Sequence, residues 1–260
     1  MRYDITGSLL QTLTIALDPG EMIFSQTHAM AWMSDSIEMD THTGGGMFAG
    51  LRRSLSGGSF FITDFTSSRT TGEVTFAPRF PGTILAMTLA SGQSLVCRKE
   101  TFLCAEKSVG LDIVFQQRLG AGLFAGEGFI LQQVTGPGTV FLDLSGEVVE
   151  KMLAPGERLR VQAGHIGIQD PTVDTDITLV SGFRNAVFGC EGFFLATLTG
   201  PGRVWLQSMP ILNLAEEIGR HLPGRTAVDA SVGAGIGRVV GGGAAGAAIG
   251  GLIGGILGSD

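Results

Sequence analysis

Positively charged residues are scarce in this 260-residue chain. It has 17 lysines and arginines against 24 aspartates and glutamates, a formal net charge of −7 and a pI near 5.1. The adjacent basic pairs are Arg52-Arg53 and Arg98-Lys99, and we interpret both as solvated loop charges. Nucleic-acid binding requires clustered lysines and arginines to contact phosphates. The composition therefore excludes a generic nucleic-acid-binding protein.

Cysteine is also rare, and the N-terminus lacks a long apolar run. Cys97, Cys104 and Cys190 form no CxxC motif and cannot all pair with one another, which excludes a disulfide scaffold and predicts reduced, mostly buried thiols. The segment MRYDITGSLL has no apolar stretch of signal-peptide length. We therefore expect the protein to lie on the cytoplasmic side of any membrane.

No catalytic or cofactor motif is found. The chain has no Walker loop and no GxSxG nucleophile elbow, and His28, His42, His165 and His221 have no zinc-site spacing. His28 and His165 fall near each other in the repeat frame described below, so a shared metal is the competing hypothesis to two ordinary hydrogen-bonded histidines. The acidic run at 170–176 is interpreted as a solvated loop rather than a cation site. We predict no enzyme activity, no catalytic residue, no cofactor and no metal.

What the sequence does contain is copies of itself. EGFILQQVTGPGTVFLD follows Gly126 and EGFFLATLTGPGRVWLQ follows Cys190, so matching positions are separated by 64 residues. A more diverged copy lies upstream, with Phe60 in the place of Phe129 and Phe193. Self-similarity at a fixed period indicates a repeated structural unit whose copies share a core. We predict three units, at about residues 13–89, 90–153 and 154–211.

Each predicted unit carries a turn glycine followed by alternating polar and apolar residues. These glycines are Gly20, Gly92 and Gly156, with spacings of 72 and 64 residues. The surplus in the first unit is assigned to a polar, glycine-rich loop at residues 39–58. We expect the three glycines to occupy equivalent turns.

Short apolar runs bounded by glycine, proline or serine predict an all-β body. Val140, Leu142 and Leu144 lie on one face of a predicted strand and Phe141 on the other, and residues 203–207 repeat this pattern. Apolar residues on both faces indicate strands that are covered on both sides. With 44% hydrophobic residues, the chain can bury a sizeable core.

The C-terminal region differs in composition. An amphipathic helix is predicted within residues 212–224, with Asn213 as its N-cap and Glu216 as the capping-box partner. Residues 225–260 form a glycine-rich tail that is either disordered or a helix in contact with a membrane. Small residues along one helical stripe allow helices to pack closely in lipid. Such a stripe recurs every fourth residue at Gly242, Gly246, Gly250, Gly254 and Gly258.

The order of motifs closely resembles the AIM24 family. The matching segments include MAWMSDSIEMDTHTGGGMFAGLRRSLSGGSFFITDFTS, GEVTFAPRFPGTI, PGERLRVQAGHIGIQD and both long repeat copies, and they cover roughly residues 13–209. This resemblance implies an all-β fold similar to the tryptophan-RNA-binding attenuator subunit. Its triplicated sandwich-like or barrel-like units would surround a pseudo-threefold axis. The second unit departs from the third, with ETFLCAE in place of GHIGIQD, so any pocket should be asymmetric.

Two functions follow as expectations. The first is a non-enzymatic scaffold or membrane-associated accessory protein, since the resemblance implies a link to inner-membrane complexes but supplies no catalytic residues. The alternative is a β-barrel that binds a small ligand or acts as an enzyme. Unprotected strand edges promote association between chains. Because folds related to the one that the resemblance implies form rings, we expect a homo-oligomer, most simply a trimer. We expect a cytoplasmic protein, peripheral to the inner membrane or anchored in it by the tail.

Overall fold

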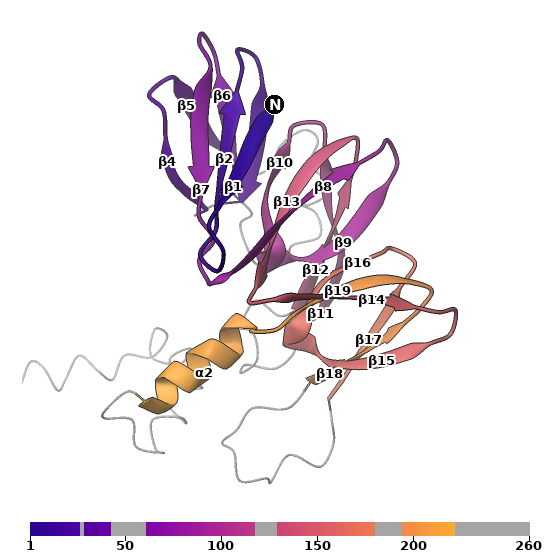
Figure 1. Cartoon of the computed structure of the whole chain (residues 1–260). Helices are drawn as coiled ribbons and strands as arrows, with labels where there is room; N and C mark the ends of the chain where they lie inside the picture. Colours follow the sequence, from indigo (N-terminus) through magenta and orange to yellow (C-terminus); the bar gives the residue numbers. More distant parts are fainter. Residues whose placement is uncertain (27–28, 43–60, 118–128, 180–193, 222–260) are drawn as a thin grey trace, which may run out of the picture.

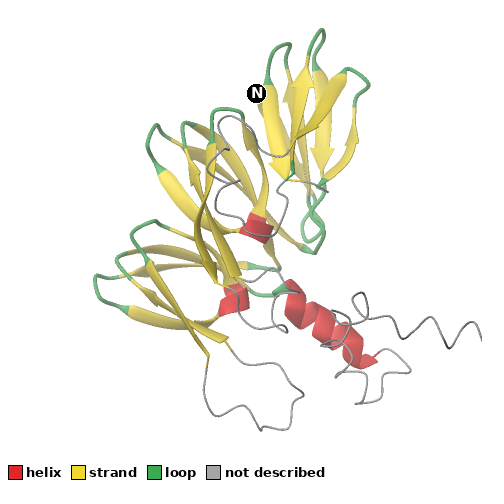
Figure 2. Cartoon of the chain, turned by 180° about the vertical axis from the view of Figure 1, so that it is seen from behind, coloured by secondary structure: helices red, strands yellow, loops and turns green. Residues whose placement is uncertain are grey.

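The structure, a computed structural model, describes residues 1–26, 29–42, 61–117, 129–179 and 194–221. These residues form antiparallel β-sheets and one α-helix, which confirms the all-β prediction with a short C-terminal helix. The sheets follow one another along the molecule, from the N-terminal strands to the last strands of the chain (Figure 1). Figure 2 shows the same succession from behind.

Four sheets make up the described body. The first has the strand order β1-β2-β7-β4 and the second β5-β6-β3-β10-β13-β8. The third has the order β11-β12-β9-β16-β19-β14 and the fourth β15-β18-β17. Their strands are β1 (Arg2–Thr6), β2 (Thr12–Leu17), β3 (Met22–Gln26), β4 (Met30–Met33), β5 (Ile37–His42), β6 (Ile62–Ser67), β7 (Gly72–Phe76), β8 (Gly82–Leu89), β9 (Ser94–Arg98), β10 (Phe102–Glu106), β11 (Gly110–Gln117), β12 (Phe129–Thr135), β13 (Gly138–Ser145), β14 (Val148–Leu153), β15 (Arg158–Gln162), β16 (Ile166–Gln169), β17 (Asp174–Leu179), β18 (Phe194–Thr199) and β19 (Gly202–Gln207).

Two strand pairings connect parts of the chain that are far apart in sequence. We call each of these pairings a joint. In the first joint, β3 pairs antiparallel with β10, so that Ser25 lies opposite Cys104. In the second joint, β9 pairs antiparallel with β16, and Cys97 lies opposite Ile168. Because each joint continues a six-stranded sheet, consecutive groups of strands form one hydrogen-bonded body.

Strands β13 and β19 are buried on both faces, as the sequence predicts. Val140, Leu142 and Leu144 belong to one apolar core, whereas Phe141 belongs to another. We name three cores by their order along the chain: the first core includes Leu13 and Phe76. The second core contains Leu142, and the third core contains Val161.

The three predicted turn glycines have the same local geometry. Gly20, Gly92 and Gly156 have φ values of 89°, 78° and 75°, which favour glycine because other side chains are strained there. In each turn the residue after the glycine donates its backbone N–H to the carbonyl three residues earlier, at 2.9, 3.0 and 2.9 Å. The triplication of whole units and the pseudo-threefold axis stay predictions. Phe129 is buried in β12, while Phe60 and Phe193 lie outside the described residues.

Two segments expected to be loops are partly strands. Residues 39–42 of the predicted glycine-rich loop continue β5, which pairs with β6 from Ile37 opposite Ser67 to His42 opposite Ile62. Residues 174–176 of the acidic run begin β17, which pairs with β18. Both loop predictions were wrong there because pairing with a neighbouring strand outweighed the polar composition.

The C-terminal helix α2 (Ile211–His221) begins earlier than predicted. The carbonyl of Pro210 accepts the backbone N–H of Leu214 at 3.2 Å, so the helix starts directly after Pro210. Asn213 is therefore inside the helix, and its assignment as the N-cap was wrong. Within the described part of the chain, no helix is long and apolar enough to span a membrane.

Candidate functional site

A groove of about 520 Å³ lies beside the first joint and the N-terminus. The turn between β2 and β3 contributes Gly20 and Glu21, and the end of β10 contributes Glu106 and Lys107. Met1 also lines the groove. The groove therefore brings the Met1 ammonium and two carboxylates to one place, and we take it as a candidate site among the described residues.

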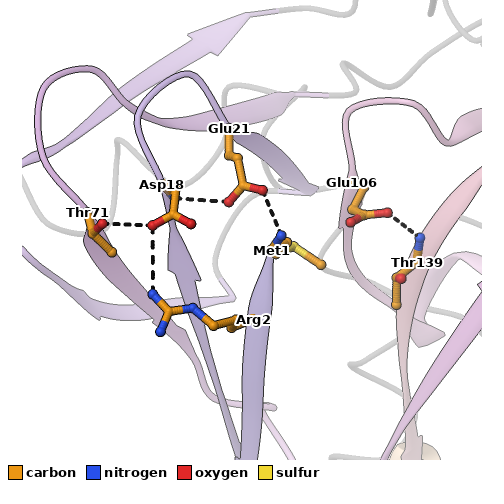
Figure 3. A network of polar contacts seen from close by, with 7 residues as sticks. All are labelled: Met1, Arg2, Asp18, Glu21, Thr71, Glu106 and Thr139. Carbon is orange, nitrogen blue, oxygen red and sulfur yellow. Dashed lines mark hydrogen bonds and ion pairs between the residues drawn. The ribbon is translucent and has the colours of Figure 1, made fainter.

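Glu21 is held from two sides (Figure 3). The N-terminal ammonium of Met1 donates to Oε1 at 2.6 Å, and the backbone N–H of Asp18 donates to Oε2 at 2.9 Å. These hydrogen bonds, first the one from Met1, lower the pKa of Glu21 below its usual value. The same contact with Glu21 raises the pKa of the Met1 amine. Both groups are therefore charged near neutral pH and hold each other.

The other carboxylates shown in Figure 3 also bond within the fold. Glu106 Oε2 accepts the backbone N–H of Thr139 at 2.7 Å. Asp18 Oδ1 accepts the hydroxyl of Thr71 at 2.7 Å, with the exposed Arg2 guanidinium 3.7 Å away. Each carboxylate thus stabilises a turn or a strand end.

The same backbone contacts recur away from the groove. Gln93 Oε1 accepts the backbone N–H of Ala90 at 3.1 Å, and Glu157 Oε2 accepts that of Ala154 at 2.8 Å. An uncharged amide therefore performs at Gln93 the task that a carboxylate performs at Glu21. This comparison indicates that Glu21 stabilises its turn in the same way as Gln93 and Glu157.

Of the two histidines that could share a metal, the structure describes His165 but not His28, so their pairing stays a hypothesis. His165 Nδ1 lies 2.7 Å from the carbonyl of Gln207, which makes it the N–H donor of an ordinary hydrogen bond, and His28 lies outside the described residues. His42 is 3.2 Å from Asp64, and His221 is 3.1 Å from Glu217. Across the ranges that the structure describes, no three histidine, cysteine or acidic side chains form a metal cluster.

The structure describes some of the other residues singled out in the sequence and leaves others outside the described ranges. Asp170, in the acidic run, forms an ion pair with Arg203, whose Nε lies 3.2 Å from Oδ2. Cys97 and Cys104 are buried free thiols, and burial raises the pKa of Cys97 to about 12. Cys190 and the pair Arg52-Arg53 lie outside the described residues, as does the tail stripe at Gly242, Gly246, Gly250, Gly254 and Gly258.

The prediction that Arg98 is a solvated loop charge was wrong. Only 6% of this residue is exposed. Its guanidinium donates to the carbonyl of Gly164 at 3.2 Å, lies 3.0 Å from Glu100 and stands over the Phe129 ring at 5.4 Å. No local sequence pattern predicts this burial, because Gly164 belongs to the other side of the second joint.

Two further side chains with buried polar atoms, Gln132 and Asp143, were not predicted from the sequence. Gln132 is fully buried, and neither of its side-chain polar atoms has a hydrogen-bond partner among the described residues. Asp143 Oδ1 likewise lacks a partner in the described part of the chain, and burial raises the pKa of Asp143 from 3.8 to about 7. They lie on different strands and do not converge with the groove residues on one point.

Comparisons with known proteins identify a family and a relative. The model of the family described as "Mitochondrial biogenesis AIM24" matches residues 3–209. An uncharacterized protein of Streptococcus pyogenes serotype M6 is 28% identical over 232 residues, which cover 86% of this chain and 92% of that protein.

A solved structure shares the fold. The X-ray crystal structure of a Streptococcus pyogenes protein superposes with a TM-score of 0.69 and 24% sequence identity, covering 85% of this chain and 99% of the other. Since the family match spans most of the all-β body, the chain belongs to the AIM24 family.

Proposed function

We propose that this protein is a non-enzymatic scaffold that supports protein complexes next to a membrane. The observation that supports a scaffold is the use of the groove carboxylates: Glu21 and Glu106 each accept a backbone N–H and so stabilise the β body. A catalytic site needs polar groups that converge on a substrate. The groove offers instead polar groups that are occupied by the fold itself.

The β body suits this role because its sheets continue across both joints. Continuous backbone hydrogen bonding makes a rigid support, and the units are proposed to repeat around a pseudo-threefold axis as the internal copies suggest. The family description, which concerns mitochondrial biogenesis, agrees with a role in assembly. In this proposal the body carries partners and performs no chemistry.

The tail is proposed to provide the membrane contact. Its glycines from Gly242 to Gly258 recur every fourth residue, and a helix with this stripe can pack closely against another helix in lipid. The protein would then lie on the cytoplasmic side, attached at the inner membrane through the tail. Removing the stripe should affect association without changing the β body.

A small-ligand role for the groove is the second candidate function, favoured by its volume of about 520 Å³. That volume falls within the usual range for small-molecule pockets. The groove lining carries both charges, with Met1 and Lys107 beside Glu21 and Glu106, so a ligand with groups of both signs would suit it. In this case a ligand would stabilise the full-length protein against thermal unfolding.

The test compares the full-length protein with the triple variant Gly246→Leu, Gly250→Leu and Gly254→Leu in cell fractions and crosslinking. Close packing predicts loss of crosslinked membrane partners, because leucine side chains keep the helices apart. Insertion through hydrophobicity alone predicts equal or stronger membrane binding.

The matched control is Ala244→Leu, Ala247→Leu and Ala248→Leu, which adds leucines off the stripe. The control should keep its partners. A wild-type protein that is wholly soluble and purifies with no membrane component would refute the proposal. Ligand-dependent thermal stabilisation would then favour the second candidate.

A further inference from the structure

The described loops and turns of the β body lie at two opposite ends of its strands (Figures 1 and 2). The end that we call the turn end contains the three turn glycines, and its turns are residues 18–21, 34–36, 68–71, 90–93, 107–109, 136–137, 154–157, 170–173 and 200–201. The end that we call the helix end is where α2 leaves the body, and its loops are residues 7–11, 77–81, 99–101, 146–147, 163–165 and 208–210.

Backbone hydrogen bonds connect the loops of the helix end to one another. The backbone N–H of Gly82 donates to the carbonyl of Leu9 at 2.7 Å, and Leu10 forms a parallel bridge with Gly82. The backbone N–H of Gly146 donates in turn to the carbonyl of Pro81 at 2.8 Å. The loop after β1 is therefore fixed to the loops before β8 and β14.

The same connection continues to the C-terminal helix. The backbone N–H of Met209 donates to the carbonyl of Ser145 at 3.1 Å, next to Gly146. Leu214, in the first turn of α2, donates its backbone N–H to the carbonyl of Pro210 at 3.2 Å. One continuous series of backbone contacts thus joins the first loop of the chain to α2.

Large apolar side chains are exposed on this connected surface. Leu10 is 74% exposed, Leu9 54% and Met209 48%, although the backbone of each is held by the contacts above. Phe61, directly before β6, and Ile218 on α2 are exposed at the same end. Because the backbone is fixed, the fold itself presents these side chains to the surroundings.

The turn end has the opposite character. Among the described residues, no large apolar side chain is exposed in its turns. The charged side chains of these turns are mostly acidic: Asp18, Glu21, Asp35, Glu157 and Asp170, with Arg69 and Lys107. In the loops of the helix end, Arg79 and Lys99 balance Glu100 and Glu147. The two ends of the body therefore differ in polarity, and the apolar end is the one that carries α2.

Helix α2 continues the apolar surface. Ile211, Leu214, Ala215 and Ile218 recur at i, i+3, i+4 and i+7, which places them in one stripe along the helix. Ala215 and Ile218 are exposed, and Ile211 and Leu214 are only partly buried. A helix with an apolar stripe and a polar opposite side is typical of segments that lie in a membrane interface.

We propose that the helix end is the surface through which this protein lies on a lipid bilayer. Leu9, Leu10, Met209 and Ile218 then enter the boundary between headgroups and acyl chains, which removes exposed apolar surface from water. This inference rests on the proposed function and deepens it, because it identifies the end of the β body that faces the membrane. The charged turn end, which includes the groove beside Met1, faces away from the lipid.

The direction of the chain supports a lipid surface as the occupant of the helix end. The sequence continues from α2, at this end, toward the uncharged run at residues 239–258 that is proposed to contact the membrane. The body and the tail then contact the same bilayer from the same side. Two weak apolar contacts on one chain reinforce each other, because the second forms without a new encounter.

The first test measures flotation of the full-length protein with vesicles of phosphatidylcholine, which carry no net charge. Leu10→Glu should lower the vesicle partition coefficient about tenfold or more, because an apolar contact is lost and a carboxylate enters the boundary. The matched control is Met152→Glu, since Met152 is 67% exposed on β14 next to the turn end. The control should bind like the wild type, and circular dichroism checks that both variants keep the β fold.

The second test determines which end contacts lipid and stays informative when the tail dominates the affinity. Full-length chains in a Cys190→Ser background carry either Leu10→Cys at the helix end or Ser91→Cys at the turn end, labelled with an environment-sensitive dye. Cys97 and Cys104 are buried and should remain unlabelled. Vesicles should shield the dye at position 10 from iodide quenching and leave the dye at position 91 accessible.

The outcomes separate this inference from the proposed function. A wild-type protein that does not float would overturn both. Flotation that Leu10→Glu leaves unchanged, with equal iodide quenching of the two dyes, would overturn the helix end alone and leave the tail as the membrane contact.

Two further results would assign the helix end to another occupant and so overturn the lipid contact. One is a Leu10→Glu variant that keeps its vesicle binding but loses crosslinked membrane proteins, which would indicate a protein partner. The other is a Leu10→Glu variant with unchanged vesicle binding and a lower mass by light scattering, which would indicate a second copy of this chain.

Discussion

The two joints share a backbone register but differ in the side chains that stabilise them. In the first joint Phe24 and Phe102 stack with ring centroids 5.6 Å apart, and the Ser25 hydroxyl donates to the carbonyl of Leu103 at 2.7 Å. In the second joint Cys97 replaces Ser25, and the buried Arg98 donates across the joint to Gly164. The strand pattern therefore determines the pairing, and the side chains determine how it is stabilised.

The largest effect is expected from Phe24→Ala at the first joint. Phe24 is almost fully buried, and its removal leaves a cavity beside Phe102 in the second core. Large-to-small substitutions of this kind cost about 3–5 kcal/mol of unfolding free energy. Chemical denaturation of the full-length protein measures the loss.

Val149→Ala is the matched control for Phe24→Ala, since Val149 is 46% exposed on β14. The control should change the unfolding free energy by less than about 0.5 kcal/mol. Equal losses in the two variants would mean that the first joint is not stabilised by aromatic packing.

Asp143 provides a comparison between strands that border the two joints. It lies on β13 at the position that Gln207 occupies on β19, by the register of the pairings with β10 and β16. Gln207 donates to the carbonyl of Gly164 at 2.8 Å and accepts the backbone N–H of Ser145 at 3.0 Å. Asp143 has a carboxylate oxygen without a partner among the described residues, so its ionisation is costly.

Asp143→Asn should therefore stabilise the protein at neutral and alkaline pH. Burial raises the folded-state pKa of Asp143 from 3.8 to about 7, so the folded chain retains a proton that the unfolded chain loses. Below pH 3.8 both states are protonated and the wild type carries no penalty. As pH rises to about 7 the wild type loses stability, and above that the cost is constant.

The expected gain of Asp143→Asn is on the order of 3 kcal/mol at pH 9 and vanishes near pH 3. Denaturation of both proteins across this range measures it. A difference that stays constant with pH would show that Asp143 does not titrate between the two values. Asp112→Asn, on the exposed part of β11, is the control for the substitution itself and should change the unfolding free energy by less than about 0.5 kcal/mol.

The sequence predicts local features of this fold better than contacts across the joints. The turn glycines Gly20, Gly92 and Gly156 were predictable because each sits in a short local signal that requires a positive φ. The two-faced burial around Phe141 followed from the alternation of side chains along a strand. Both features depend on residues close together in sequence.

The burial of Arg98 could not be predicted in this way. Its acceptor, Gly164, is 66 residues away and approaches only through the pairing of β9 with β16. The groove was missed for the same reason, since Met1 reaches Glu21 and Glu106 only through the folded body. The strands at residues 37–42 and 174–179 are likewise stabilised by partners rather than by their own polar composition.

The smallest effect is expected from Arg98→Gln at the second joint. Glutamine already occupies the corresponding positions of β3 and β15, at Gln26 and Gln162, so the backbone accommodates it. The substitution removes the charge that pairs with Glu100 and stands over Phe129 but retains an amide donor. We expect a loss of about 1 kcal/mol, against about 2 kcal/mol for Arg98→Ala, which removes the donor as well.

Denaturation at low and high salt distinguishes these contributions in the Arg98 series. The ion pair with Glu100 is partly exposed, so salt should weaken the wild type slightly and leave both variants unaffected. Lys151→Ala, an exposed change on β14, should have an effect below about 0.5 kcal/mol. If Arg98→Gln cost as much as Phe24→Ala, the charge itself would hold the second joint, and the two joints would differ in the strength of their stabilisation as well as in its chemistry.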